Sequence, residues 1–198
     1  FVADDPIGGV WLMLWKGAGV GFLALYAAFR TRGFDGLLIA GALTLGALGD
    51  VTLEISFLIG GALFALGHAV AIILYLRNRR ASTSSSQVLA GGSLLLLTPL
   101  IAGLIAYPLP NWIVATAYSA VVGGMAAAAW TSCFPRYRVG LGAVMFVVSD
   151  LLIFAREAAA LPDFVTAWTI WPLYFGGQFL IATGVVQTLR MDRRPDKT

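Results

Sequence analysis

The sequence predicts an all-α integral membrane protein, a polytopic bundle of seven transmembrane helices. Hydrophobic residues make up 59% of the 198-residue chain, and charged residues only 12%. The mean hydropathy is +0.85, and a water-soluble domain of this size could not bury so much apolar surface. The apolar runs are long enough to cross a bilayer as helices, and they lack the strict alternation of polar and apolar residues found in membrane barrels.

The first three expected spans are residues 10–29, 35–54 and 57–76, each a run of mostly apolar side chains. The basic segment RTRG divides the first from the second, which ends near Glu54. The third ends at RNRRASTSSSQ, residues 77–87, which we expect to form the longest loop and a flexible one. This part of the chain therefore predicts three successive helices joined by polar segments.

Four further spans are expected at residues 88–107, 112–131, 139–156 and 165–189. The proline turn YPLPN separates the first two, the basic segment FPRYR the next two, and the acidic, proline-containing EAAALPD the last two. Glycines at spacings near three and four, as in YFGGQ, let membrane helices approach closely. We therefore predict a single transmembrane helical domain over residues 1–198.

The basic residues lie in alternate connections, which places them at one face of the membrane. Of the 13 Lys and Arg residues, all but Lys16 and Arg156 follow the first, third, fifth or seventh span. Loops on the cytoplasmic side carry an excess of Lys and Arg, so we expect this face in the cytoplasm. The prediction is a protein of a bacterial inner (cell) membrane whose N-terminus lies outside.

The polar side chains of the spans lie from mid-membrane toward the opposite face. Asp50 is about one helical turn, roughly 6 Å, from the outer end of the second span, and Asp150 is roughly 8 Å from the outer end of the sixth. Two acids on separate helices therefore reach a similar depth. The other polar residues in this half or near the middle are Lys16, His68, Tyr118, Tyr174 and Gln178. This distribution predicts a polar cavity that opens outward.

Asp50 and Asp150 are the candidate functional residues, because an ionised acid within a membrane normally faces the bundle interior and marks a site. The alternative for Asp50 is an interfacial position in which it pairs with Lys16. The alternative for Asp150 is a side chain that reaches the interface and pairs with Arg156. His68 either belongs to the site or is a hydrogen-bonded structural histidine.

The remaining polar residues also have two interpretations each. Glu54 and Glu157 lie at span ends, where we expect solvated side chains. Tyr174 and Gln178 share a helix face at a spacing of four, and they either line the site or bond across helices. Lys16 either holds a phosphate group or balances an acid.

The residue inventory restricts the chemistry of a site. One histidine and one cysteine, Cys133, cannot build a three-histidine or cysteine-rich zinc site or an intrachain disulfide. The last span has no lysine to carry retinal, and neither a Gly-x-Ser-x-Gly motif nor a phosphate-binding glycine-rich loop is present. A pair of carboxyl groups in a low-dielectric pocket remains, and one of them can stay protonated while the other is ionised. Such a pair can donate a proton and activate water, and so cleave an acid-sensitive bond through an oxocarbenium-like state.

Four segments follow one another along nearly the whole chain: GALGD, GGALFALGHAVAIILY, GAVMFVVSDLLIF and YFGGQFLI. In their order and spacing they resemble the successive motifs of the YhhN family of lysoplasmalogenases. Members of that family are usually drawn with eight spans, so the resemblance implies that this chain corresponds to the family without its first helix. The family often has Lys-Pro where this chain has Lys16-Gly17.

The resemblance implies hydrolysis of the vinyl ether bond of lysoplasmalogens to a fatty aldehyde and a glycerophospho-head group. Asp50 and Asp150 would share the acid and base roles, in either order. The implied partners are a lysophospholipid substrate and the surrounding membrane lipids, with no nucleic acid, cofactor or metal. The residues expected to bind or orient the substrate are Lys16, as a phosphate contact, and His68, Tyr118, Tyr174 and Gln178.

The sequence is also compatible with two other classes of function. A small lipid or solute transporter, or a binding protein, would use the acid pair as a proton relay. A structural membrane protein would use the acids only to pair helices. Inverted repeats would favour a transporter, and none is visible in the sequence.

Overall fold

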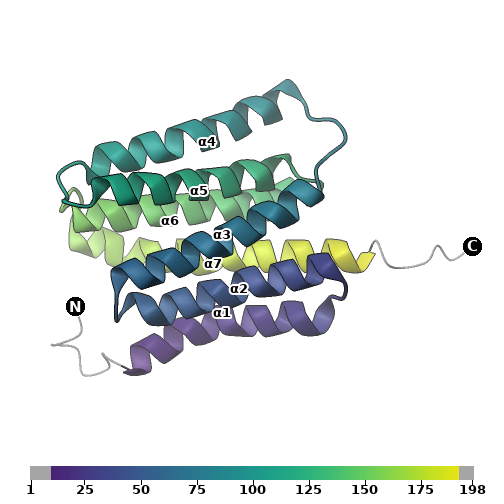
Figure 1. The fold of residues 1–198 in the computed structure, drawn as a ribbon, viewed down its shortest axis with the longest axis horizontal. Coiled ribbons are helices and arrows are strands. Elements are labelled where there is room, and N and C mark those ends of the chain that lie inside the picture. The colour runs from purple at the N-terminus through teal and green to yellow at the C-terminus, as the bar shows by residue number, and fades with distance from the viewer. Residues whose placement is uncertain (1–9, 192–198) are drawn as a thin grey trace, which may run out of the picture.

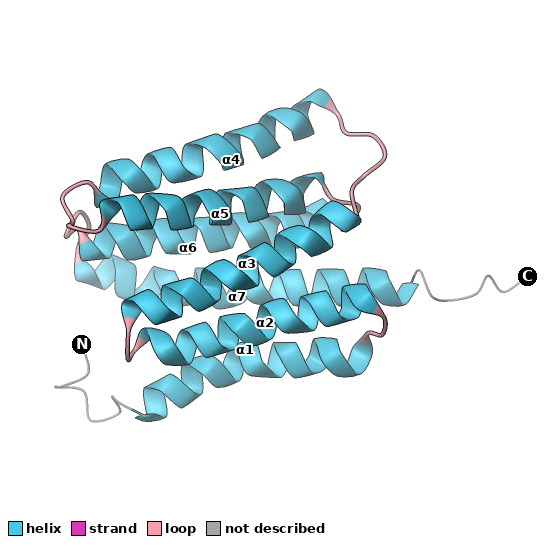
Figure 2. Ribbon diagram, viewed as in Figure 1, coloured by secondary structure: helices cyan, strands magenta, loops and turns pink. Residues whose placement is uncertain are grey.

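The computed structural model describes residues 10–191, and within this range the chain folds into a bundle of seven α-helices (Figure 1, Figure 2). A π-helical turn, η1, leads into the sixth. The elements are α1 (Val10–Arg30), α2 (Phe34–Leu53), α3 (Phe57–Arg77), α4 (Ser85–Ala106), α5 (Trp112–Thr131), η1 (Arg136–Gly140), α6 (Leu141–Glu157) and α7 (Asp163–Met191). The predicted helical bundle and its seven helices are therefore confirmed.

The bundle has the properties of an integral membrane protein. Helices α2 to α7, with η1 counted as part of α6, are long and apolar enough to cross a membrane. Helix α1 is as long as α3, at 21 residues, and packs along α2. Large apolar side chains cover the outside of the bundle, and Phe22, Leu89 and Leu104 are each at least 70% exposed. Such a surface suits lipid tails, because a water-soluble protein rarely exposes so many large apolar side chains.

Six of the helices close a ring, in the order α1, α2, α3, α5, α6 and α7, and α7 returns to α1. Helix α4 stands outside this ring, where it packs on α5 and α6 (Figure 1). Contacts between α2 and α7 cross the ring. Helices α2 and α7 therefore meet inside the ring, so side chains of both can reach the same interior space.

Glycines bring α6 and α7 into close contact. A Cβ atom added at Gly142 would lie 2.7 Å from the carbonyl oxygen of Gly177, and one added at Gly177 would lie 2.6 Å from that of Gly142. The two backbones therefore touch directly, as small residues allow in membrane helix pairs. This contact holds α7 at the depth and rotation that place its polar residues inside the ring.

The helices begin within two residues of the predicted positions except for α4, which begins three residues early because of local hydrogen bonding. The expected span 88–107 begins at Ser85, because the Ser84 and Gln87 side chains form a reciprocal capping box at its N-terminus. Residues at the end of the polar stretch 77–87 thus start a helix. The expected span 139–156 is preceded by η1, whose residues continue directly into α6.

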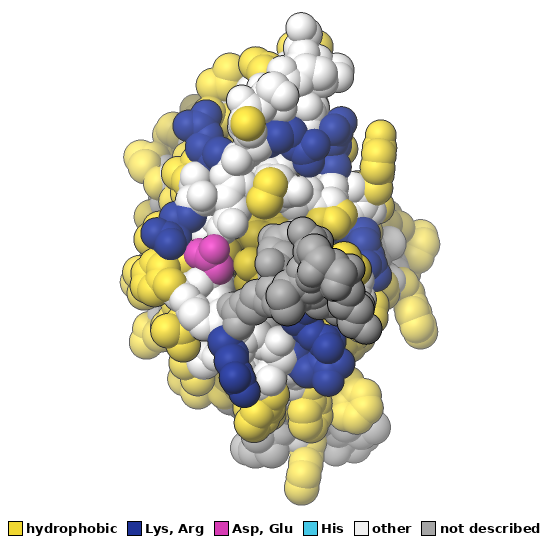
Figure 3. Space-filling view, turned by 90° about the vertical axis from the view of Figure 1, so that its right-hand side faces the viewer, with side chains coloured by type: hydrophobic (Ala, Val, Ile, Leu, Met, Phe, Trp, Pro, Cys, Tyr) yellow, Lys and Arg dark blue, Asp and Glu magenta, His cyan; other side chains and the backbone are white. Residues whose placement is uncertain are grey.

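The basic residues gather at one end of the bundle, which faces the viewer in Figure 3. Arg77 pairs with Asp35 at 3.0 Å, Arg80 donates to the carbonyl oxygen of Ser132, and Arg138 donates to Gln187. The basic residues at positions 193, 194 and 197, which the sequence analysis assigns to the same face, lie outside the described residues. The arginines at this end are Arg30, Arg32, Arg77, Arg79, Arg80, Arg136, Arg138 and Arg190. The basic ends of the helices thus lie together, whereas Asp50, Glu54, Asp150 and Glu157 lie toward the opposite end.

Candidate active site

A cleft with a volume of about 820 Å³ lies at the end of the bundle opposite the basic loops. Residues of α2, α3, α5, α6 and α7 at this end line it, and α1 contributes Lys16. Most of the lining is apolar, from side chains such as Leu53, Val121 and Ile170. The polar and charged lining residues are Lys16, Asp50, Glu54, Asn111, Tyr118, Asp150, Arg156, Glu157 and Tyr174. A site of this size and mixed lining suits an amphiphilic small molecule.

Asp50 enters the cleft from α2. Its side chain is buried, with 8% of the residue exposed, and Oδ2 accepts a 2.8 Å hydrogen bond from the Tyr174 hydroxyl of α7. The preceding Gly49 makes room for this arrangement, since a Cβ atom there would lie 2.9 Å from the Phe64 ring. The GALGD segment thus lets an aromatic ring of α3 lie against α2 beside the acid.

Asp150 enters the same cleft from α6. It is buried to the same extent, at 8% exposure, and its Oδ2 accepts a 2.8 Å hydrogen bond from the Tyr118 hydroxyl of α5. The Tyr118 oxygen also lies 3.5 Å from Nε2 of His68 on α3. Phe146 and Phe154 precede and follow Asp150 by four residues, so all three share one face of α6. The two acids, which the sequence singles out as ionisable residues at matching depth in apolar spans, thus line one cleft, each with a tyrosine partner.

Two ion pairs lie beside the acids in the cleft. Lys16 pairs with Glu54 at 2.5 Å, and Arg156 pairs with Glu157 at 3.6 Å. The sequence-based alternative that Lys16 pairs with Asp50 is therefore not what the structure shows, because Glu54 takes this role. The expectation of a solvated Glu54 is also wrong, since its side chain is only 16% exposed and accepts the hydrogen bond from Lys16.

Aromatic rings form the inner wall of the cleft. The Phe64 ring lies 5.9 Å from that of Tyr174 and 6.2 Å from that of Phe146, in edge-on arrangements. Phe146 contacts Tyr174 and His68 in the same way, with ring centroids 5.2 and 4.6 Å apart. Edge-to-face packing of this kind fixes the rings relative to one another. The wall therefore separates the cleft from the centre of the bundle.

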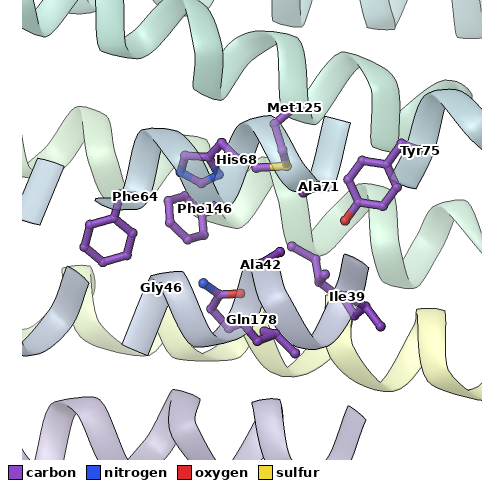
Figure 4. Close-up of a pocket in the computed structure, with 13 residues that line it drawn as sticks. Ile39, Ala42, Gly46, Phe64, His68, Ala71, Tyr75, Met125, Phe146 and Gln178 are labelled. Atoms are coloured by element: carbon purple, nitrogen blue, oxygen red, sulfur yellow. The ribbon is translucent and has the colours of Figure 1, made fainter. Parts of the chain in front are cut away.

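Behind this wall lies a second, smaller cavity of about 30 Å³, which we call the inner cavity (Figure 4). His68 and Gln178 line the inner cavity and not the cleft. Both are buried, at 6% and 8% exposure. His68 and Gln178 therefore lie behind the cleft. The other residues that the sequence predicts for the site line the cleft itself: Lys16, Asp50, Tyr118, Asp150 and Tyr174.

The sequence analysis did not assign several residues of the cleft to the site. Glu54 follows Asp50 by four residues and Trp171 precedes Tyr174 by three, and these spacings place each pair on one helix face. Helical periodicity counted from the acids and tyrosines could therefore have identified both. Asn111 belongs to a loop, where no periodicity applies. The Trp171 indole Nε1 is buried and has no hydrogen-bond partner among residues 10–191.

The arrangement offers acid–base chemistry at two points of one cleft. Each carboxyl group has one oxygen held by a tyrosine and can use the other to exchange a proton with a bound molecule. Within the described part of the chain, no three His, Cys, Asp or Glu side chains come together in a way that could hold a metal ion.

Comparison with known proteins adds a family. The sequence profile of the YhhN family matches residues 11–185, which include both acids, both tyrosines and all the charged residues of the cleft. No curated protein and no solved structure shows a significant match.

Proposed function

The chain belongs to the YhhN family, and we propose that it is a membrane-embedded hydrolase that cleaves the vinyl ether bond of lysoplasmalogen-type lysophospholipids. The products are a fatty aldehyde and a glycerophospho-head group. The observation that carries this proposal is that Asp50 and Asp150, from two helices distant in sequence, line the same cleft, each bonded to a tyrosine.

The lining of the cleft suits a lipid with one chain. Lys16 and Arg156 supply positive charge for the phosphate group, and the buried Trp171 Nε1 supplies a further donor. Apolar and aromatic side chains supply a surface for the alkenyl chain. We place the vinyl ether between the two acids, at the boundary between these regions.

The first step is protonation of the vinyl ether. One aspartic acid transfers its proton to the β-carbon, and the electrons of the double bond form the new C–H bond. The α-carbon and the ether oxygen then share the positive charge of an oxocarbenium ion. The second aspartate, still ionised, stabilises this cation and takes a proton from water as the water oxygen bonds to the α-carbon. The result is a neutral hemiacetal.

Collapse of the hemiacetal restores both acids. The second aspartic acid, now protonated, gives its proton to the ether oxygen as the C–O bond breaks. The first, now ionised, takes the hydroxyl proton as the aldehyde C=O bond forms. The sum is the addition of one water molecule to the vinyl ether and its division into aldehyde and alcohol, with no cofactor consumed.

The proposed orientation follows from the basic end. Because basic loops are retained in the cytoplasm, the cleft at the opposite end opens toward the non-cytoplasmic leaflet of the cell membrane. Reaction of an externally added, membrane-impermeant thiol reagent with cysteines introduced at Ala160 and at Ala81 would test this orientation.

The proposed function is tested by replacing each acid. Asp50→Asn and Asp150→Asn should each reduce aldehyde release from a lysoplasmalogen in detergent by about 10²- to 10⁴-fold, the range for loss of a general acid or base. Asp35→Asn is the matched control, because Asp35 lies on α2 at the other end of the bundle and pairs with Arg77. Full activity in either acid variant would remove that residue from the mechanism.

The same experiment separates the enzyme from its alternatives. A wild-type protein that binds lysoplasmalogen without product formation, and that moves a lipid or solute into liposomes, would be a transporter or binding protein. Acid variants that alter only thermal stability would indicate a structural role for the pair.

A further inference from the structure

The inner cavity contains polar groups from two helices in an otherwise apolar part of the bundle. Its apolar lining includes Ile39, Met125 and Phe146. Its polar groups are the hydroxyl of Tyr75 and the imidazole of His68, both on α3, and the amide of Gln178 on α7. Buried polar groups of this kind require hydrogen-bond partners.

The Tyr75 hydroxyl shows most directly that a partner is needed. Tyr75 is fully buried, at 0% exposure, and its oxygen has no hydrogen-bond partner among the described residues. Figure 4 shows the hydroxyl directed toward the space between Ala71 and Ile39. A buried hydroxyl without a partner loses its bonds to water and gains none in exchange, which destabilises the fold.

Both tyrosine–aspartate pairs of the cleft reach back to the inner cavity. On one side, the Tyr118 hydroxyl donates to Asp150, so its oxygen can accept from Nε2–H of His68. In the neutral imidazole, Nδ1 is then an acceptor.

On the other side, the Tyr174 hydroxyl donates to Asp50, and its oxygen interacts with the Gln178 amide. The Gln178 side chain retains its carbonyl oxygen as an acceptor. The inner cavity therefore presents two acceptors, one from each side, and one hydroxyl donor from Tyr75.

We propose that the inner cavity is a water-binding site, in which ordered water accepts from the Tyr75 hydroxyl and donates to His68 and Gln178. Its volume of about 30 Å³ is large enough for a water molecule. Three hydrogen bonds are typical of a buried water. The inner cavity offers this water one hydroxyl donor and two acceptors.

This water joins the two sides of the site into one network, from Asp50 through Tyr174 and Gln178 to His68, Tyr118 and Asp150. His68 and Gln178 contact the tyrosines and not the acids. Both are therefore positioning residues, which hold the two carboxyl groups in fixed positions through Tyr118 and Tyr174. This role rests on the proposed function, whereas the water site itself does not.

The sign of a stability change tests the water site without any need for turnover. Tyr75→Phe removes only the hydroxyl group and keeps the ring packed on Phe134. A water-bound hydroxyl predicts that Tm falls by a few degrees, because a hydrogen bond of the network is lost. A dry cavity predicts that Tm rises, because an unsatisfied group is removed, and this result would overturn the proposal. Tyr137→Phe, at a residue 78% exposed, is the control and should leave Tm unchanged.

A kinetic measurement tests the coupling to the acids. Tyr75 does not line the cleft, so Tyr75→Phe should leave KM unchanged while kcat falls about 2- to 10-fold, the effect of one hydrogen bond. An unchanged kcat would overturn the coupling. If the wild type releases no aldehyde, the proposed function fails, and the melting experiment still decides whether the cavity binds water.

Discussion

Gly142→Ala is expected to push α6 and α7 apart and to reduce both stability and activity. The added Cβ atom would lie 2.7 Å from the carbonyl oxygen of Gly177 and 3.1 Å from both Leu180 Cβ and Ile181 Cγ1. A backbone oxygen cannot rotate out of the way as a side chain can. The helices must therefore separate by roughly half an ångström or more to restore ordinary contact distances.

The size of the effect follows from this contact. Overpacking at a closely packed site costs about 1–3 kcal/mol, and the better helix propensity of alanine offsets up to about 1 kcal/mol of this. We expect the free energy of unfolding to fall by about 1–2 kcal/mol, and Tm by a few degrees. Gly177 lies one turn after Tyr174, so the same displacement lengthens the bond from Tyr174 to Asp50. A misplacement of this size should lower aldehyde release by about tenfold.

Thermal unfolding in detergent and aldehyde release would be measured on the same preparations. Gly41→Ala is the control, because no atom lies within 4 Å of a Cβ added there, and it should be neutral or slightly stabilising. A Gly142→Ala protein that melts at or above the wild-type temperature with full activity would refute the packing argument.

Two further predictions concern the cleft. Tyr118→Phe and Tyr174→Phe each remove the hydrogen bond to one acid. A hydrogen bond to an ionised carboxylate is worth about 1.5–3 kcal/mol, and each acid is ionised at one stage of the proposed reaction, so kcat for aldehyde release should fall by about 10- to 100-fold. Normal kcat in both variants would show that the tyrosines do not act on the acids. Lys16→Met should raise KM for the lysophospholipid by about 2- to 5-fold with kcat unchanged. The effect is small because Lys16 is partly exposed and solvent weakens its contact with phosphate. Initial rates measured over a range of substrate concentrations give KM, and an unchanged KM would argue against a phosphate contact.

Hydrophobicity and charge placement were enough to predict most of the fold. Apolar runs identify membrane helices because lipid demands them over a fixed length, and alternate basic loops identify the direction of each helix. The direction and length of each helix determine the depth of its residues in the membrane. Asp50 and Asp150 could therefore be assigned to the same depth. Their common cleft then follows from the cost of exposing an acid to lipid.

Helix rotation could not be predicted in the same way. The spans are apolar on nearly every side, so they have no polar face that would show which residues point inward. His68 and Gln178 therefore could not be told from residues of the cleft, although they stand behind its aromatic wall. The partner of Lys16 depends on rotation as well, since Asp50 and Glu54 lie one turn apart on α2 and only the packing of α1 selects Glu54.

The confinement of the cleft to one end of the bundle bears on lipid asymmetry. The other end is closed by tightly packed small residues such as Ala27, Ala129 and Ala182, each 0% exposed. On the proposed function, whichever way the protein is inserted, it draws its substrate from a single monolayer and returns the aldehyde to that same monolayer. Lysolipids of the other monolayer would have to flip across before they could be degraded, so the rate of transbilayer movement would limit the clearance of that pool.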